Sequence, residues 1–148
     1  MELWELAARE QIRVTLARYN HNGDRGRVTQ LAEQFAPDGV LEISGGPTYE
    51  GREAIEAGLG GGVKERIAGA GDGPKPIVRH HVSSVLIEDV TPEEAHAASY
   101  FAVMSRDGLD HWGRYRDTLK VVDGEWKIAH RYVRVDARVE GSWAPAPS

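Results

Sequence analysis

The sequence contains no cysteine, which excludes disulfide bonds and catalysis by a thiol. A chain without disulfides is typical of a reducing compartment, so we expect a cytoplasmic protein. No apolar run approaches the length that spans a membrane, and the first residues lack the pattern of a signal peptide. An excess of basic charge is also missing, because 23 acidic residues outweigh 18 basic ones. Neither a membrane nor nucleic acid is therefore an expected partner.

The chain nevertheless has enough apolar residues for a globular domain. Of its 148 residues, 41% are hydrophobic, and this length fits one domain with a single core. We expect that domain to span residues 1–136. Residues 137–148 end in APAPS, which predicts a partly disordered tail from which Trp143 can dock onto the domain.

The first half of the chain predicts helices interspersed with short strands. Residues 2–20 carry an apolar stripe at helical spacing, formed by Trp4, Ala8, Ile12, Leu16 and Tyr19. We expect this helix to end at His21-Asn22-Gly23. Two further helices are predicted at residues 27–35 and 52–59, and two short strands at residues 39–44 and 49–50.

A glycine-rich segment follows the third predicted helix. Residues 58–62 read GLGGG, and residues 68–76 are again rich in glycine and proline. We expect the glycines to interrupt the helix. The whole segment 58–76 then reads either as a mobile lid over a binding site or as an ordinary surface loop.

The second half of the chain is strand throughout. Long strands are predicted at residues 77–88 and 94–106, followed by a hairpin over residues 112–136. Helices followed by a meander of strands define an α+β class, in which the N-terminal helices should lie on one curved, mostly antiparallel sheet. We expect the sheet to wrap around the helices as a cone with an internal pocket.

The hairpin has a register that the sequence predicts. Asp123-Gly124 is a strong signal for a two-residue turn, which places Val122 opposite Glu125. Strict alternation from there sets Asp117 opposite His130, as a structural pair or as part of a site. Arg131 would lie on the other face unless a bulge reorients it.

Two side chains elsewhere are candidates for chemistry. Asp24 follows the first helix and reads either as the N-cap of the next helix or as a carboxylate at the pocket. His80 and His81 open a long strand, so they point to opposite faces, and only one of them can enter the pocket. That arrangement argues against a shared metal ion. A histidine beside a carboxylate is what general-base chemistry at neutral pH requires.

The order of several motifs resembles one family. The chain from about residue 6 to residue 135 is similar to the SnoaL-like group of the cone-shaped fold shared with nuclear transport factor two. The motifs that carry this resemblance are Tyr19 and Asp24 followed by LAEQFAPDGVLE, then YEGREAI, RHHVSS and GRYRDTLKVVDGEWKIAHR. The group includes scytalone dehydratase, bile-acid dehydratase, hexachlorocyclohexane dehydrochlorinase, ketosteroid isomerase, limonene epoxide hydrolase, polyketide cyclases and members with no known catalysis.

The resemblance implies specific site residues. Asp24 and His80 match the aspartate and histidine that the dehydratase and dehydrochlorinase branch pairs, and Tyr19 matches a pocket tyrosine of the dehydratases. Arg131 resembles an arginine of the last strand in the dehydrochlorinase. The aromatic side chains that we expect either to line a substrate pocket or to fill the core are Tyr49, Tyr100, Tyr115 and Trp112.

These residues lead to one hypothesis and two alternatives. We expect a lyase or isomerase without cofactor or metal, in which His80 abstracts a proton from a small, apolar, oxygenated substrate of the polyketide, steroid or terpenoid type. The alternatives are a binding protein that uses the same pocket without turnover, and an assembly module whose pocket has no function. Relatives form homodimers and homotrimers, so the exposed face of the sheet is expected to associate.

Overall fold

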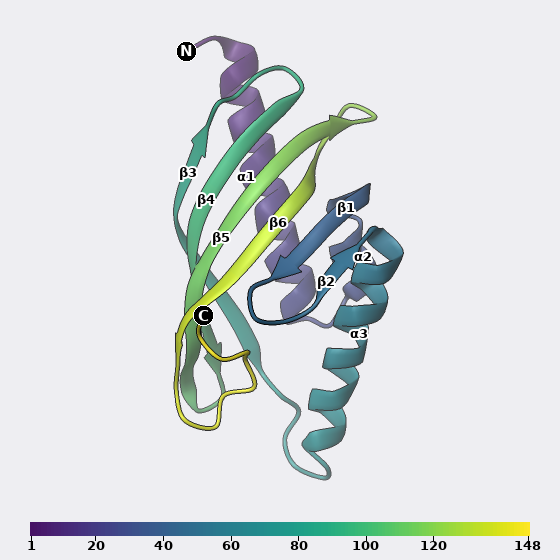
Figure 1. Cartoon of the computed structure of the whole chain (residues 1–148), viewed down its shortest axis with the longest axis vertical. Helices are drawn as coiled ribbons and strands as arrows, with labels where there is room; N and C mark the ends of the chain where they lie inside the picture. Colours follow the sequence, from purple (N-terminus) through teal and green to yellow (C-terminus); the bar gives the residue numbers. More distant parts are fainter.

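One mixed sheet forms the framework of the protein, and its strands lie in the order β2-β1-β6-β5-β4-β3 (Figure 1). The computed structural model describes all 148 residues. The strands are β1 (Phe35–Ile43), β2 (Thr48–Glu50), β3 (Val78–Glu88), β4 (Glu94–Ser105), β5 (Gly108–Val122) and β6 (Glu125–Arg138). All neighbouring strands are antiparallel except β1 and β6, which run parallel. The α+β class expected from the sequence is confirmed.

Three helices accompany the sheet, namely α1 (Leu3–Asp24), α2 (Val28–Ala32) and α3 (Arg52–Gly69). Figure 1 shows α1 running obliquely behind the long strands, while α3 lies beside the short strands β1 and β2. The stripe predicted for α1 is buried at Ala8, Ile12, Leu16 and Tyr19, but its first member, Trp4, is exposed. None of these helices is long and apolar enough to cross a membrane.

The first helix is longer than the sequence suggested. It continues through His21-Asn22-Gly23 to Asp24, because the segment contains no proline and Gly23 sits in contact with α2. A Cβ at Gly23 would lie only 3.1 Å from the Leu31 side chain. The predicted end at residue 20 is therefore wrong. Asp24 does not cap α2, whose N-cap position is Arg27 and makes no side-chain hydrogen bond.

The predicted break in the third helix is also wrong, because α3 continues through the GLGGG segment. Gly58 explains why glycine is needed there. A Cβ at this position would lie 2.2 Å from the Tyr49 ring of β2, so the missing side chain lets the ring pack onto the helix. The only part of the proposed lid segment without helix is the connection between α3 and β3.

The hairpin has the predicted turn but not the predicted register along its length. Val122 lies opposite Glu125, as expected. A shift between Thr118 and Leu119 then places Thr118 opposite His130 and Asp117 opposite Arg131. The extra residue of this bulge reverses the facing of the next residues in β6. The expected Asp117–His130 pair is thus wrong, and His130 instead contacts Glu42 on the exposed face.

Two glycines of α3 provide a test of the packing between α3 and β2. Gly58→Ala should destabilise the fold by about 1–3 kcal/mol, because the Tyr49 ring has to move to admit the methyl group. Gly61→Ala is the matched control, since nothing lies within 4 Å of its Cβ position. It should stabilise the protein by up to about 1 kcal/mol through helix propensity. Chemical denaturation measures both changes, and equal effects of the two substitutions would contradict this packing.

Candidate functional site

A cavity of about 490 Å³ lies between the concave face of the sheet, α1, α3 and the C-terminal tail. We term it the main cavity. Most of its lining is hydrophobic. The apolar wall comes from β1, β6 and α3, with Leu41, Ile43, Leu59, Val63, Val133 and Val135. His80 of β3 and His111 of β5 also line the cavity, so a bound molecule would meet imidazoles as well as apolar side chains.

Asp24 and His80 form a hydrogen-bonded pair at the wall of the main cavity. The Asp24 Oδ1 to His80 Nδ1 distance is 2.5 Å, and the backbone N–H of His80 donates to Asp24 Oδ2 at 3.0 Å. Both carboxylate oxygens therefore hold His80, although 56 residues separate the partners in the chain. The His80 side chain stays 23% exposed, so Nε2 is the ring nitrogen left for chemistry. His81 points to the exposed side of β3, as alternation predicted.

A second imidazole on the same wall was not identified from the sequence. His111 Nδ1 lies 2.7 Å from Asp110 Oδ2, and both side chains are buried. Neighbouring residues of a regular strand point to opposite faces, but the register shifts between Val103 and Met104, where Asp110 is the extra residue of β5. This bulge lets Asp110 and His111 turn inward together. The sequence pattern alone contains no signal for it.

The two imidazoles belong to one row across the sheet. His80 lies opposite Val103, and Val103 lies opposite His111, so the two histidines share a face with one strand between them. The Phe101 ring approaches both, with centroid distances of 6.3 Å to His80 and 6.0 Å to His111. Each ring is held through Nδ1 by its own aspartate, which leaves two Nε2 atoms on the same side of the sheet.

The C-terminal tail completes the surroundings of His111. The Ser142 hydroxyl donates to Asp110 Oδ2 at 2.5 Å, the oxygen that also contacts His111. The Trp143 ring meets the His111 ring edge to face at 5.5 Å. Arg138 donates to the Ala144 carbonyl at 2.6 Å, which fastens the tail to the end of β6. The tail is therefore part of the wall of the main cavity.

Arg131, which the resemblance matched to an arginine of the last strand, pairs with an acidic residue and does not line the cavity. Arg131 is only 1% exposed, is not among the residues that line the cavity, and donates from Nε and Nη2 to the two oxygens of Asp117 at 2.7 and 2.9 Å. Its guanidinium lies between the rings of Tyr19 and Tyr115, at 4.3 and 3.8 Å from their centroids. Burial opposes its charge, but Asp117 outweighs that effect and raises the pKa of Arg131. Arg131 thus supports the cavity from behind.

The expected aromatic residues divide between two faces of the sheet. Tyr19, Tyr49 and Tyr115 line the main cavity. Burial raises the pKa of both Tyr19 and Tyr115, so their hydroxyl groups stay protonated and can donate hydrogen bonds. Tyr100 and Trp112, in contrast, are 59% and 38% exposed on the outer face, because each lies next to an inward-facing residue of its strand. Their assignment to the pocket is wrong.

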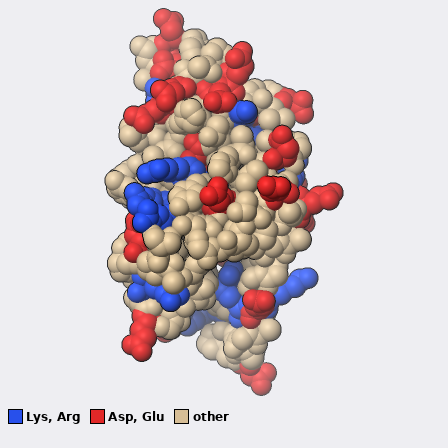
Figure 2. All heavy atoms as spheres, in the orientation of Figure 1, with Lys and Arg blue, Asp and Glu red and all other residues tan.

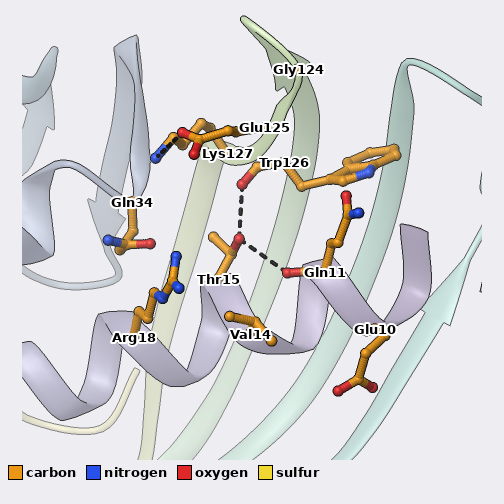
Figure 3. A pocket seen from close by; sticks show the side chains of 10 residues that line it. All are labelled: Glu10, Gln11, Val14, Thr15, Arg18, Gln34, Gly124, Glu125, Trp126 and Lys127. Atoms are coloured by element: carbon orange, nitrogen blue, oxygen red, sulfur yellow. Dashed lines mark hydrogen bonds and ion pairs between the residues drawn. The ribbon is translucent and has the colours of Figure 1, made fainter. Parts of the chain in front are cut away.

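A separate hollow of about 330 Å³ lies between α1 and the β5–β6 turn. Figure 3 shows the Thr15 hydroxyl there, within hydrogen-bonding distance of the Trp126 and Gln11 carbonyls, and Lys127 paired with Glu125. These polar groups already satisfy one another, and no histidine is present. Groups of three or more acidic, cysteine or histidine side chains placed to hold a metal ion do not occur in the structure.

Comparisons with known proteins agree with this architecture. Residues 4–132 match the SnoaL-like domain, and the chain belongs to this family. No curated protein sequence matches the chain. A candidate scytalone dehydratase from Novosphingobium aromaticivorans has a similar structure, with a TM-score of 0.81, 23% identity, and coverage of 99% of this chain and 96% of that one.

Two further solved structures are similar. An NTF2-like protein with a cystatin-like fold, also from Novosphingobium aromaticivorans, has a TM-score of 0.71 and 25% identity over 97% of this chain and 94% of that one. A protein from Catenulispora acidiphila, solved in complex with S-DNPA, has a TM-score of 0.74 and 28% identity over 88% of this chain and 95% of that one. The cone-shaped fold expected from the sequence is thereby confirmed.

The buried position of His111 predicts a specific pH dependence of stability. Desolvation lowers the pKa of His111 below 6.5, although Asp110 opposes the shift. The unfolded chain therefore binds a proton at higher pH than the folded one. The stabilising contribution of neutral His111 is complete above about pH 6.5 and is lost as the pH falls through the folded-state pKa.

Urea denaturation of His111→Asn at a series of pH values tests this effect. The variant should lose less stability than the wild type as the pH falls from about 7 to about 5, because it has no imidazole to protonate. His96→Gln serves as the control, since His96 is exposed and should leave the wild-type dependence unchanged. Parallel pH profiles of wild type and His111→Asn would refute the assignment.

Proposed function

We propose that the protein is a lyase or isomerase that moves a proton on a small, mainly apolar, oxygenated substrate without a cofactor. The observation that carries this proposal is the 2.5 Å contact between Asp24 and His80 at the wall of a largely apolar cavity of about 490 Å³. A carboxylate on Nδ1 fixes the tautomer whose Nε2 accepts a proton, and it stabilises the imidazolium that forms. The pair thus combines a base with a space for substrate.

The proposed reaction is an elimination or an isomerisation next to a carbonyl group. His80 Nε2 takes a proton from the carbon beside the carbonyl, and the electron pair moves toward the carbonyl oxygen. In an elimination, the pair then forms the new double bond while a hydroxyl group leaves with the proton that His80 returns, so that water is released. In an isomerisation, His80 returns the proton to another carbon atom.

The remaining polar groups of the cavity fit supporting roles. Tyr19 and Tyr115 keep their protons and can donate to the oxygen on which negative charge develops. His111 is neutral near pH 7 because burial lowers its pKa, so its Nε2 can accept a hydrogen bond from a substrate hydroxyl. The apolar wall of β1, β6 and α3 suits the hydrocarbon part of a polyketide, steroid or terpenoid.

The relatives support the same class of activity. The structure that is a candidate scytalone dehydratase points to elimination of water, and the complex with S-DNPA shows that a relative holds a small molecule. Binding without turnover is the alternative that uses the same cavity. The two functions differ in the fate of the ligand, which a binding protein would retain unchanged.

Exchange of substrate hydrogen for deuterium tests the proposal independently of the leaving group. The protein is incubated in heavy water with a panel of bicyclic ketones and hydroxyketones, and mass spectrometry measures deuterium uptake and loss of water. Wild type should catalyse uptake into at least one compound. His80→Gln and Asp24→Asn should lower that rate by about 10²–10⁴-fold and by at least about tenfold, respectively, as expected for a general base and its partner.

The control for these variants is His81→Gln, which removes the neighbouring imidazole on the exposed face. It should retain the wild-type rate, because His81 does not reach the main cavity. Full activity of both His80→Gln and Asp24→Asn on the compound identified would show that the dyad is not the base. Ligand retention with no deuterium uptake in any compound would favour the binding alternative.

A further inference from the structure

A second hollow adjoins the main cavity at the lower end of α3, and we term it the basal hollow. Its volume is about 380 Å³, and its walls come from the end of α3, the 70–77 connection, the β4–β5 turn and the tail. The two spaces adjoin, because both are lined by Arg66, Val78 and Trp143. A molecule in the main cavity can therefore extend into the basal hollow.

The basal hollow is bordered by three cationic side chains, namely Arg66, Lys75 and Arg106. The guanidinium of Arg106 donates to the Lys75 carbonyl at 3.3 Å, which ties the 70–77 connection to the β4–β5 turn. In Figure 2, acidic atoms crowd the upper end of the molecule, whereas its lower half shows Lys and Arg atoms together with a few acidic groups. This local positive charge contrasts with the net charge of −5 of the whole chain.

Arg66 is the unusual member of this group, because it is half-buried without an acidic partner. It forms no salt bridge, and desolvation is the one cause that lowers its pKa. The centroid of the Trp143 ring is 6.0 Å from the Arg66 guanidinium, at the limit of a useful cation–π contact. A partly desolvated guanidinium with free donors is a strong binding group for carboxylate or phosphate oxygens.

The acidic side chains around the hollow do not neutralise Arg66. Asp110 contacts His111 and Ser142 through Oδ2 and forms no salt bridge with Arg66. Asp107 is exposed in the β4–β5 turn and Glu65 is exposed on α3. The positive charge of Arg66 also reaches into the main cavity, since it contributes to the lowered pKa of His111. An anion at the junction would compensate the charge of Arg66.

We propose that the substrate carries an anionic arm, a carboxylate or a phosphate, which Arg66 binds at the junction while the apolar part fills the main cavity. This inference rests on the proposed function for the apolar part of the substrate. Lys75 and Arg106 would attract the arm into the basal hollow, and Arg66 would make the direct contact. The arm would orient the substrate so that its reacting carbon faces His80 and His111.

Isothermal titration calorimetry with three matched probes tests this inference. The probes share a naphthyl group on a butyl chain and differ only at its end, as naphthylbutanoate, naphthylbutyl phosphate and naphthylbutanol. The wild type should bind at least one anion about tenfold more tightly than the alcohol, as a charge-assisted contact predicts. The anion that binds more tightly identifies the arm as carboxylate or phosphate.

Two variants with the same change of charge locate the contact. Arg66→Gln should abolish the preference for the anion and leave binding of the alcohol within about twofold of the wild type. Lys64→Gln lies two positions earlier on the exposed side of α3 and should retain the preference. Thermal unfolding of each variant confirms that the fold is intact before binding is compared.

Several results would overturn the inference. These are equal affinity of the wild type for anions and alcohol, a retained preference in Arg66→Gln, and failure of all three probes to bind. His80→Gln separates this inference from the proposed function, because the variant should keep the preference for the anion even where deuterium uptake is lost. Deuterium uptake thus tests the catalytic dyad, and the affinity difference between anion and alcohol tests the anionic arm, so either claim can fail without the other.

Discussion

The buried pair of Asp117 and Arg131 is the interaction on which the arrangement of the cavity depends. A desolvated arginine is tolerated in the core only because both Asp117 oxygens accept its hydrogen bonds. The Tyr19 and Tyr115 rings lie against the two sides of its guanidinium. Removal of either charge would leave the other uncompensated, at a cost of about 3–5 kcal/mol. The pair therefore fixes two cavity-lining tyrosines from behind.

Two irregularities of the strands create the rest of the site. The bulge in β6 brings Arg131 opposite Asp117, and the bulge in β5 turns Asp110 and His111 inward together. In regular strands, Arg131 and Asp110 would lie on the wrong face for their partners. Local irregularities in the hydrogen-bonded strand pairing therefore place the charged groups of the site.

The sequence predicted the elements that have strong local signals. The stripe on α1 and the Asp123-Gly124 turn were found because periodicity and turn chemistry are properties of neighbouring residues. The contact between Asp24 and His80 came from a family resemblance, since nothing local joins residues so far apart. Alternation along β5 from Tyr115 already turns His111 inward and Trp112 outward, and this pattern was not used for either residue. The inward turn of Asp110 could not be predicted, because a bulge leaves no pattern in the sequence. The glycine-rich segment, in which Gly58 makes room for Tyr49, was misread as a break in α3.

The nitrogen-15 NMR spectrum of the His80 ring tests the central claim most directly. The account predicts that near neutral pH the ring carries its proton on Nδ1, with that proton shifted strongly downfield by Asp24, and that Asp24→Asn removes the shift. His80→Gln assigns the signal among the six histidines. A ring with its proton on Nε2, or a spectrum unchanged by Asp24→Asn, would contradict a dyad in which Asp24 prepares His80 to accept a proton.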